Sequence, residues 1–193
     1  MKLRIIKASQ FKSNPWTGGT TSELFIYPET AQYKKSDFAF RLSTATIETS
    51  PSIFTPLAGI NRSLLALKGT MTLSHKRHHT KKQDQFAIDY FDGGWETKSV
   101  GTCIAFNLMT RGSTRGDISG FSIEKGEITP YEIPKECTSF FVYSHSGNSV
   151  IQHNGTSYRL QTGDLLVLES FSLPRLEVSS IEKIELVFVE ITH

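Results

Sequence analysis

Cysteine is scarce in this sequence of 193 residues, and a strong charge of one sign and long apolar runs are missing from it. Its two cysteines, Cys103 and Cys137, lie far apart in apolar surroundings, which excludes a disulfide-rich scaffold. A disulfide between them is one alternative. Buried free thiols in a reducing compartment fit those surroundings better.

The charge and hydropathy patterns also limit the classes of partner that the protein is expected to bind. The net charge is +2, and no long lysine and arginine run is interleaved with aromatic residues, so we expect no nucleic-acid partner. No apolar run approaches the ~20 residues that span a bilayer, and residues 1–7 lack the long apolar run of a signal peptide. We therefore expect a cytoplasmic protein with no membrane partner.

Motifs of common enzymatic chemistry are absent too. The nucleophile motif Gly-x-Ser-x-Gly does not occur. The glycines Gly112, Gly116 and Gly120 have the wrong spacing for a phosphate loop or a dinucleotide fingerprint. The sequence thus predicts no cofactor.

Histidines gather in one segment, residues 75–85, at His75, His78 and His79. Lysine and arginine side chains are interspersed with them, and neighbouring positive charges disfavour a bound cation. We expect a solvated basic loop without a metal, which attracts acidic ligands weakly and in a salt-dependent way. The role of the segment stays open.

The chain does contain many short apolar runs. Their roughly 8–12-residue spacing, with Gly, Pro and Asn between them, predicts an all-β barrel or sandwich. Each half has a predicted hairpin with a glycine turn, at Gly69 and at Gly155. The glycine-rich residues 111–120 separate the halves, so we expect two tandem β-barrels, at residues 1–117 and 118–193.

Two segments predict the wall of a binding site. Residues 16–23 combine a tryptophan, two adjacent glycines, hydroxyl groups and a carboxylate before a strand, in which Thr21 and Glu23 share one face. Residues 38–47 alternate between large apolar side chains and a second set that is small apart from one cation, Arg41. This pattern is typical of a strand that packs on one side and lines a partly polar space on the other.

Eight side chains are candidates for binding a ligand inside the first barrel. Arginine presents a planar fork that matches a carboxylate, and amide and hydroxyl groups add hydrogen bonds. We therefore expect a small carboxylate-bearing metabolite. The candidates are Trp16, Thr21, Glu23, Arg41, Ser43, Arg62, Asn107 and Arg111. An alternative stays open, in which Arg41 and Glu23 form a structural ion pair that fills the barrel.

Six motifs in order resemble the HutD/Ves family of bicupins and cover most of residues 14–111. They are Trp16 with Gly18-Gly19-Thr20-Thr21-Ser22-Glu23-Leu24, Phe40-Arg41-Leu42-Ser43-Thr44-Ala45, Phe54 with Gly59-Ile60-Asn61-Arg62, Leu67-Lys68-Gly69, Phe91-Asp92-Gly93 with Trp95-Glu96-Thr97, and Phe106-Asn107-Leu108-Met109-Thr110-Arg111. The loop after Trp16 is shorter than in many members, and Ala105 replaces the usual acid.

The resemblance implies a bicupin, with two double-stranded β-helix (jelly-roll) barrels in one chain. It also implies, for some members, a regulatory role in histidine utilisation through binding of a small acidic metabolite. Others are stress-associated and have no assigned activity. Cupin enzymes commonly hold a metal with a His-x-His pair, a glutamate and a later histidine, and this sequence lacks that set.

Two functions stay open. The first, which we favour, is a non-enzymatic protein that senses or buffers a carboxylated metabolite. The second is a metal-free cupin enzyme, an isomerase or lyase acting on a small acid or sugar, with Glu23 as general base and Arg41 and Arg62 clamping the substrate. A homodimer is compatible with either function.

Overall fold

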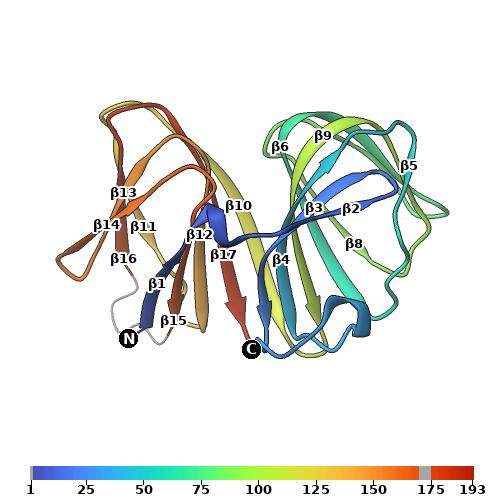
Figure 1. Ribbon diagram of the computed structural model, residues 1–193, viewed down its shortest axis with the longest axis horizontal. Helices are drawn as coiled ribbons and strands as arrows, with labels where there is room; N and C mark the ends of the chain where they lie inside the picture. Colours follow the sequence, from blue (N-terminus) through green and yellow to red (C-terminus); the bar gives the residue numbers. More distant parts are fainter. Residues whose placement is uncertain (1, 170–174) are drawn as a thin grey trace. The chain divides into compact units, whose positions relative to one another are not determined.

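The computed structural model describes residues 2–169 and 175–193, which form two all-β units (Figure 1). One unit is Phe11–Arg115, and the other combines residues 1–10 with Gly116–His193. Within the described residues, the helical segments are two short 3-10 turns, Ala8–Gln10 and Tyr33–Lys35. The prediction of an all-β chain is therefore confirmed. In this part of the chain, no helix has the length and apolar character needed to cross a membrane.

Eight strands form a single sheet in the unit Phe11–Arg115. Its main order is β2-β3-β4-β9-β6-β7, while β5 pairs with β9 and β8 pairs with β6. The strands are β2 Ser13–Trp16, β3 Gly19–Tyr27, β4 Phe40–Ile47, β5 Ser52–Ile53, β6 Ile60–His75, β7 Thr80–Gln83, β8 Ile88–Asp92 and β9 Thr97–Arg111.

The second unit contains two sheets, ordered β1-β15-β12-β17-β10 and β11-β16-β13-β14. Its core packs apolar side chains such as Phe140, Leu168 and Phe188, all of them fully or almost fully buried. The strands are β1 Lys2–Ile6, β10 Arg115–Ile123, β11 Ile128–Glu132, β12 Ser139–Ser146, β13 Ser149–His153, β14 Thr156–Leu160, β15 Leu165–Glu169, β16 Arg175–Ser179 and β17 Ile184–Thr192.

The start of the chain belongs to the second unit. Strand β1 pairs antiparallel with β15, from Lys2 opposite Glu169 to Ile6 opposite Leu165. Its apolar side chains Leu3 and Ile5 pack against the core of that unit. The expected first domain, residues 1–117, included this strand, whereas the structure groups it with the second unit. Burial of the apolar side chains of β1 joins segments that lie far apart in sequence.

The two predicted glycine hairpins have opposite outcomes. Asn154 and Gly155 take positive φ angles of 51° and 72° and join β13 to β14, so this hairpin is confirmed. The hairpin at Gly69 is wrong, because β6 continues through it as one strand of 16 residues. Gly69, with a φ of 86°, follows a register shift between Ala66 and Lys68 and lies close to the facing strand β9.

Gly19 opens β3 opposite Ile47 of β4 and has a φ of 151°. A Cβ atom at Gly19 would lie 2.0 Å from the carbonyl oxygen of Thr46, a backbone atom that cannot move without disturbing β4. The glycine is therefore required where the chain enters the sheet beside Trp16.

We expect Gly19→Ala to lower the free energy of unfolding by about 3 kcal/mol, since it adds a backbone clash to an unfavourable φ. Gly112→Ala is the matched control, because Gly112 also has a positive φ of 64° but open space around its Cβ position. We expect the control to cost only about 1–2 kcal/mol. Equal losses in urea unfolding would contradict the role of the close approach.

Candidate ligand-binding site

A cavity of about 180 Å³ lies within the unit Phe11–Arg115. Its walls combine aromatic rings, two guanidinium groups, small polar groups and aliphatic side chains. The lining residues are Trp16, Thr21, Tyr33, Arg41, Ser43, Ala45, Ile47, Phe54, Thr55, Arg62, Leu64, Asn107 and Met109.

The pairing register of strands β4, β9 and β6 determines where the two arginines lie in the cavity wall. Met109 of β9 lies opposite Arg41 of β4 on one side and opposite Arg62 of β6 on the other. Asn107 lies one inward-facing position along β9, between Ser43 and Leu64. Since side chains at i and i+2 of a strand share a face, both rows point into the same space.

Arg41 is held by an acidic partner. Its Nε donates to Glu23 Oε2 at 2.7 Å, and one terminal nitrogen donates to Ser43 Oγ at 3.0 Å. The guanidinium carbon also lies 4.4 Å from the centroid of the Tyr33 ring. The Arg41 side chain is buried, whereas that of Glu23 is 37% exposed. The ion pair predicted as an alternative therefore exists, and it leaves an open cavity beside it.

Arg62 is buried without a carboxylate partner among the residues that the structure describes. A terminal nitrogen donates to Asn107 Oδ1 at 2.8 Å. The guanidinium carbon lies 5.1 Å from the Phe54 ring centroid and 5.0 Å from that of Phe91, so aromatic faces supply part of its stabilisation. Burial lowers the pKa of Arg62 to about 10, and the charge of Arg41 contributes to this lowering. Arg62 therefore remains a cation at neutral pH.

Six of the eight candidate residues line the cavity, namely Trp16, Thr21, Arg41, Ser43, Arg62 and Asn107. Trp16 packs edge-on against Phe54, with ring centroids 6.2 Å apart. Thr21 donates its hydroxyl to the carbonyl oxygen of Thr44, which fixes its orientation.

The other two candidates lie outside the lining. Glu23 shares the inward face of β3 with Thr21, but its carboxylate is directed to Arg41. Arg111 ends β9, is exposed, and donates to the carbonyl oxygen of Ser36. Arg111 is still paired, opposite Ile60, but at the end of β9 its side chain extends past the cavity to the surface, so strand alternation alone was misleading there.

Tyr33 and Phe54 are wall residues that were not among the eight candidates. Phe54 belonged to the motifs of the family resemblance, so a pattern did mark it. Tyr33 lies in a polar segment without periodicity and reaches the cavity through the turn Tyr33–Lys35. Only the folded chain brings that turn beside Arg41.

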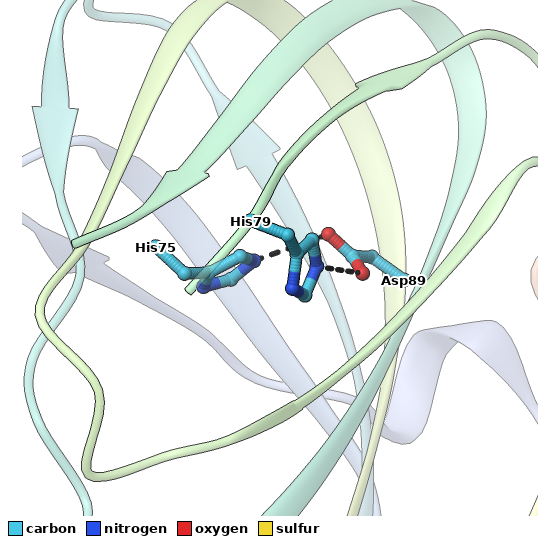
Figure 2. A group of neighbouring side chains, drawn as sticks. All are labelled: His75, His79 and Asp89. Carbon is cyan, nitrogen blue, oxygen red and sulfur yellow. Dashed lines mark hydrogen bonds and ion pairs between the residues drawn. The ribbon is translucent and has the colours of Figure 1, made fainter. Parts of the chain in front are cut away.

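The cavity lining contains no histidine, cysteine or carboxylate. A possible metal-ligating group instead comprises His75, His79 and Asp89, elsewhere in the same unit (Figure 2). The expectation of a solvated loop is wrong at His75, because this side chain is completely buried. Its partner Asp89 lies in β8, beyond the histidine segment, where no local pattern could connect them.

The comparisons with known proteins concern the family and the fold. The sequence model of the HutD family matches residues 8–187, and no curated protein matches.

Among solved structures, PA5104 of Pseudomonas aeruginosa PAO1, a conserved protein of unknown function, has 20% identity and a TM-score of 0.85, with 100% of both chains covered. HutD from Pseudomonas fluorescens SBW25, in a formate condition, has 18% identity and a TM-score of 0.74, covering 99% of this chain and 98% of its own.

A third similar structure is the bacterial pirin YhhW from Escherichia coli in complex with nickel(II). It has 12% identity and a TM-score of 0.71, with 98% of each chain covered. At these identities the structures establish an all-β, pirin-like cupin fold, while the family model spans nearly the whole sequence. The chain therefore belongs to the HutD family.

Proposed function

We propose that this chain is a non-enzymatic binding protein, which holds a small carboxylate-bearing metabolite in the cavity of Phe11–Arg115. The observation that carries the proposal is the buried guanidinium of Arg62. Its polar partner is a neutral amide, and no carboxylate of the described residues pairs with it. A buried charge without a counter-charge is costly, and a bound carboxylate would supply that counter-charge.

The charge balance of the lining supports the same proposal. Arg41 and Arg62 bring two positive charges, and the single carboxylate of Glu23 offsets one of them from beside the cavity. Within the described structure, the buried Nε1 of Trp16 and the buried Nε of Arg62 have no hydrogen-bond acceptor. The surplus is thus one of donors and positive charge, which an anionic acceptor matches.

The family membership supports a more specific proposal. We infer a HutD/Ves-type bicupin in which each unit is a cupin barrel, and which senses or buffers a metabolite of histidine utilisation. The HutD structure from Pseudomonas fluorescens was obtained in a formate condition, and formate is the simplest carboxylate. The buried free thiols of Cys103 and Cys137 suit a cytoplasmic location.

Binding is preferred to catalysis because of the position of Glu23. A general base must reach the proton that it removes. The Glu23 carboxylate accepts from Arg41 at 2.7 Å and is absent from the cavity lining. The geometry therefore gives Glu23 the role of holding Arg41.

We expect Arg62→Met to abolish ligand-induced stabilisation while leaving the free protein at least as stable as the wild type. Replacing a buried charge by an apolar side chain of similar volume is often neutral or stabilising. In thermal unfolding, urocanate or formylglutamate at about 100 times its Kd should stabilise the wild type by about 2.7 kcal/mol, and this gain should vanish in the variant.

Arg111→Met is the matched control, since it removes an exposed cation outside the cavity. We expect its ligand response to equal that of the wild type. The proposal fails if neither carboxylate shifts the wild type, or if both arginine variants lose the response equally. A large drop in the stability of free Arg62→Met would instead assign the guanidinium a structural role.

We expect Glu23→Gln to tighten carboxylate binding by about fivefold at low salt, because it removes a negative charge next to Arg41. Isothermal titration of wild type and variant with the same carboxylate, at two salt concentrations, measures this change. The gain should shrink as salt screens the charges. Unchanged or weaker binding would contradict the expectation that the negative charge of Glu23 competes with a bound carboxylate.

A further inference from the structure

A second group of polar side chains lies in the unit Phe11–Arg115, outside the cavity lining. His75 ends β6, His79 immediately precedes β7, and Asp89 lies in β8. One ligand atom of each falls within 4.8 Å of the other two. His75 Nε2 lies 3.1 Å from Asp89 Oδ2, and His79 Nε2 lies 2.8 Å from Oδ1 of the same carboxylate. Figure 2 shows the carboxylate directed toward the two imidazole rings.

We propose that His75, His79 and Asp89 bind a divalent first-row transition cation, with zinc(II) as the representative ion. Two imidazole nitrogens and one carboxylate oxygen form a ligand set that zinc takes at about 2.0–2.2 Å, with a fourth position left for water. Ligand atoms around a tetrahedral ion at that distance stand about 3.4 Å apart. The two His–Asp distances, 3.1 and 2.8 Å, would lengthen by about 0.3–0.6 Å to reach that separation, and the three ligand atoms already lie within 4.8 Å of one another.

Two of the three proposed ligands are buried and one is partly exposed, so an ion could enter from the surface and be held inside. The side chains of His75 and Asp89 are 0% and 3% exposed, whereas that of His79 is 40% exposed. Two ligands are thus fixed inside the unit, and the third lies at the surface, where an ion and its remaining water molecule can reach it.

Thr97 provides a partner that orients His75. Its hydroxyl lies 2.8 Å from His75 Nδ1 and donates to the carbonyl oxygen of Trp95 at 3.3 Å. With an ion on Nε2, the remaining ring proton of His75 would lie on Nδ1 and donate a hydrogen bond to the Thr97 hydroxyl. Metal-bound histidines commonly have such a second partner, so Thr97 would orient the His75 ring toward the ion.

The lysines of this segment do not oppose an ion at the site. Lys76 pairs with Glu96 at 2.6 Å, and Lys82 pairs with Asp84 at 3.0 Å. Lys81 donates to the carbonyl oxygen of Ile88. The charges of Lys76 and Lys82 are thus offset by carboxylates, which weakens the main reason for expecting no metal here.

Zinc titration of the full-length protein, stripped of metal by a chelator, tests the proposal. We expect one equivalent to bind and to raise the melting temperature, and cobalt(II) to give the visible absorption of a tetrahedral site. His79→Ala should weaken zinc binding about tenfold or more, and it should still fold because His79 is partly exposed.

His78→Ala is the matched control. The His78 ring stacks on Trp95 with centroids 3.6 Å apart, and it is not part of the ligand group. This variant should bind zinc as the wild type does. The proposal is overturned if the wild type takes up no zinc at one equivalent, or if His79→Ala binds zinc as tightly as His78→Ala. Asp89 would then be a structural acceptor that cross-links the two histidines.

Asp89→Asn is a second variant that keeps the shape of the carboxyl group but removes its charge. We expect it to lose the cobalt absorption while its far-ultraviolet circular dichroism stays that of the wild type. Retention of the absorption in folded Asp89→Asn would exclude the carboxylate as a ligand. If this buried substitution prevents folding, the comparison of His79→Ala with His78→Ala decides.

Discussion

The pairing register of β4, β9 and β6 is the constraint on which the candidate site depends. It places Met109 between Arg41 and Arg62, and Asn107 between Ser43 and Leu64. Because neighbouring strands lie about 4.8 Å apart, the two arginines enter the interior from strands about 10 Å apart, with a cavity in front of them. A shift of one residue in either pairing would turn one guanidinium outward, and would replace Arg41 with Phe40 or Leu42, or Arg62 with Asn61 or Ser63.

Keeping Arg62 inside costs stability, and its neighbours offset only part of that cost. One amide and two aromatic faces surround the guanidinium, while Arg41 nearby lowers its pKa further. Natural sequences break the rule against unpaired buried charge mainly at functional sites. Arg41 follows the rule, since Glu23 neutralises it. This asymmetry between the two arginines is what supports the proposed anion site over an internal ion pair alone.

Strand β8 contacts both the proposed cation site and Arg62 in the wall of the cavity. Phe91 faces Arg62 at 5.0 Å, and its ring centroid lies 4.4 Å from that of His75. Asp89, two residues earlier on the same inward face, contacts both histidines. An ion that fixes Asp89 would thus restrain the strand that carries Phe91. If the two ligands bind, any effect of one on the affinity of the other must be reciprocal.

The sequence by itself determined the all-β class, the Asn154-Gly155 turn and the inward faces of the strands that carry Thr21, Arg41, Ser43 and Asn107. These follow from alternation and turn chemistry, which act over a few residues. Tertiary structure alone decided the pairing of β1 with β15, the continuity of β6 through Gly69, the place of Tyr33 in the wall and the approach of Asp89 to His75. Each of these depends on contacts between segments whose local patterns carry no information about one another. Burial of apolar surface stabilises a contact between two segments whatever their separation in sequence.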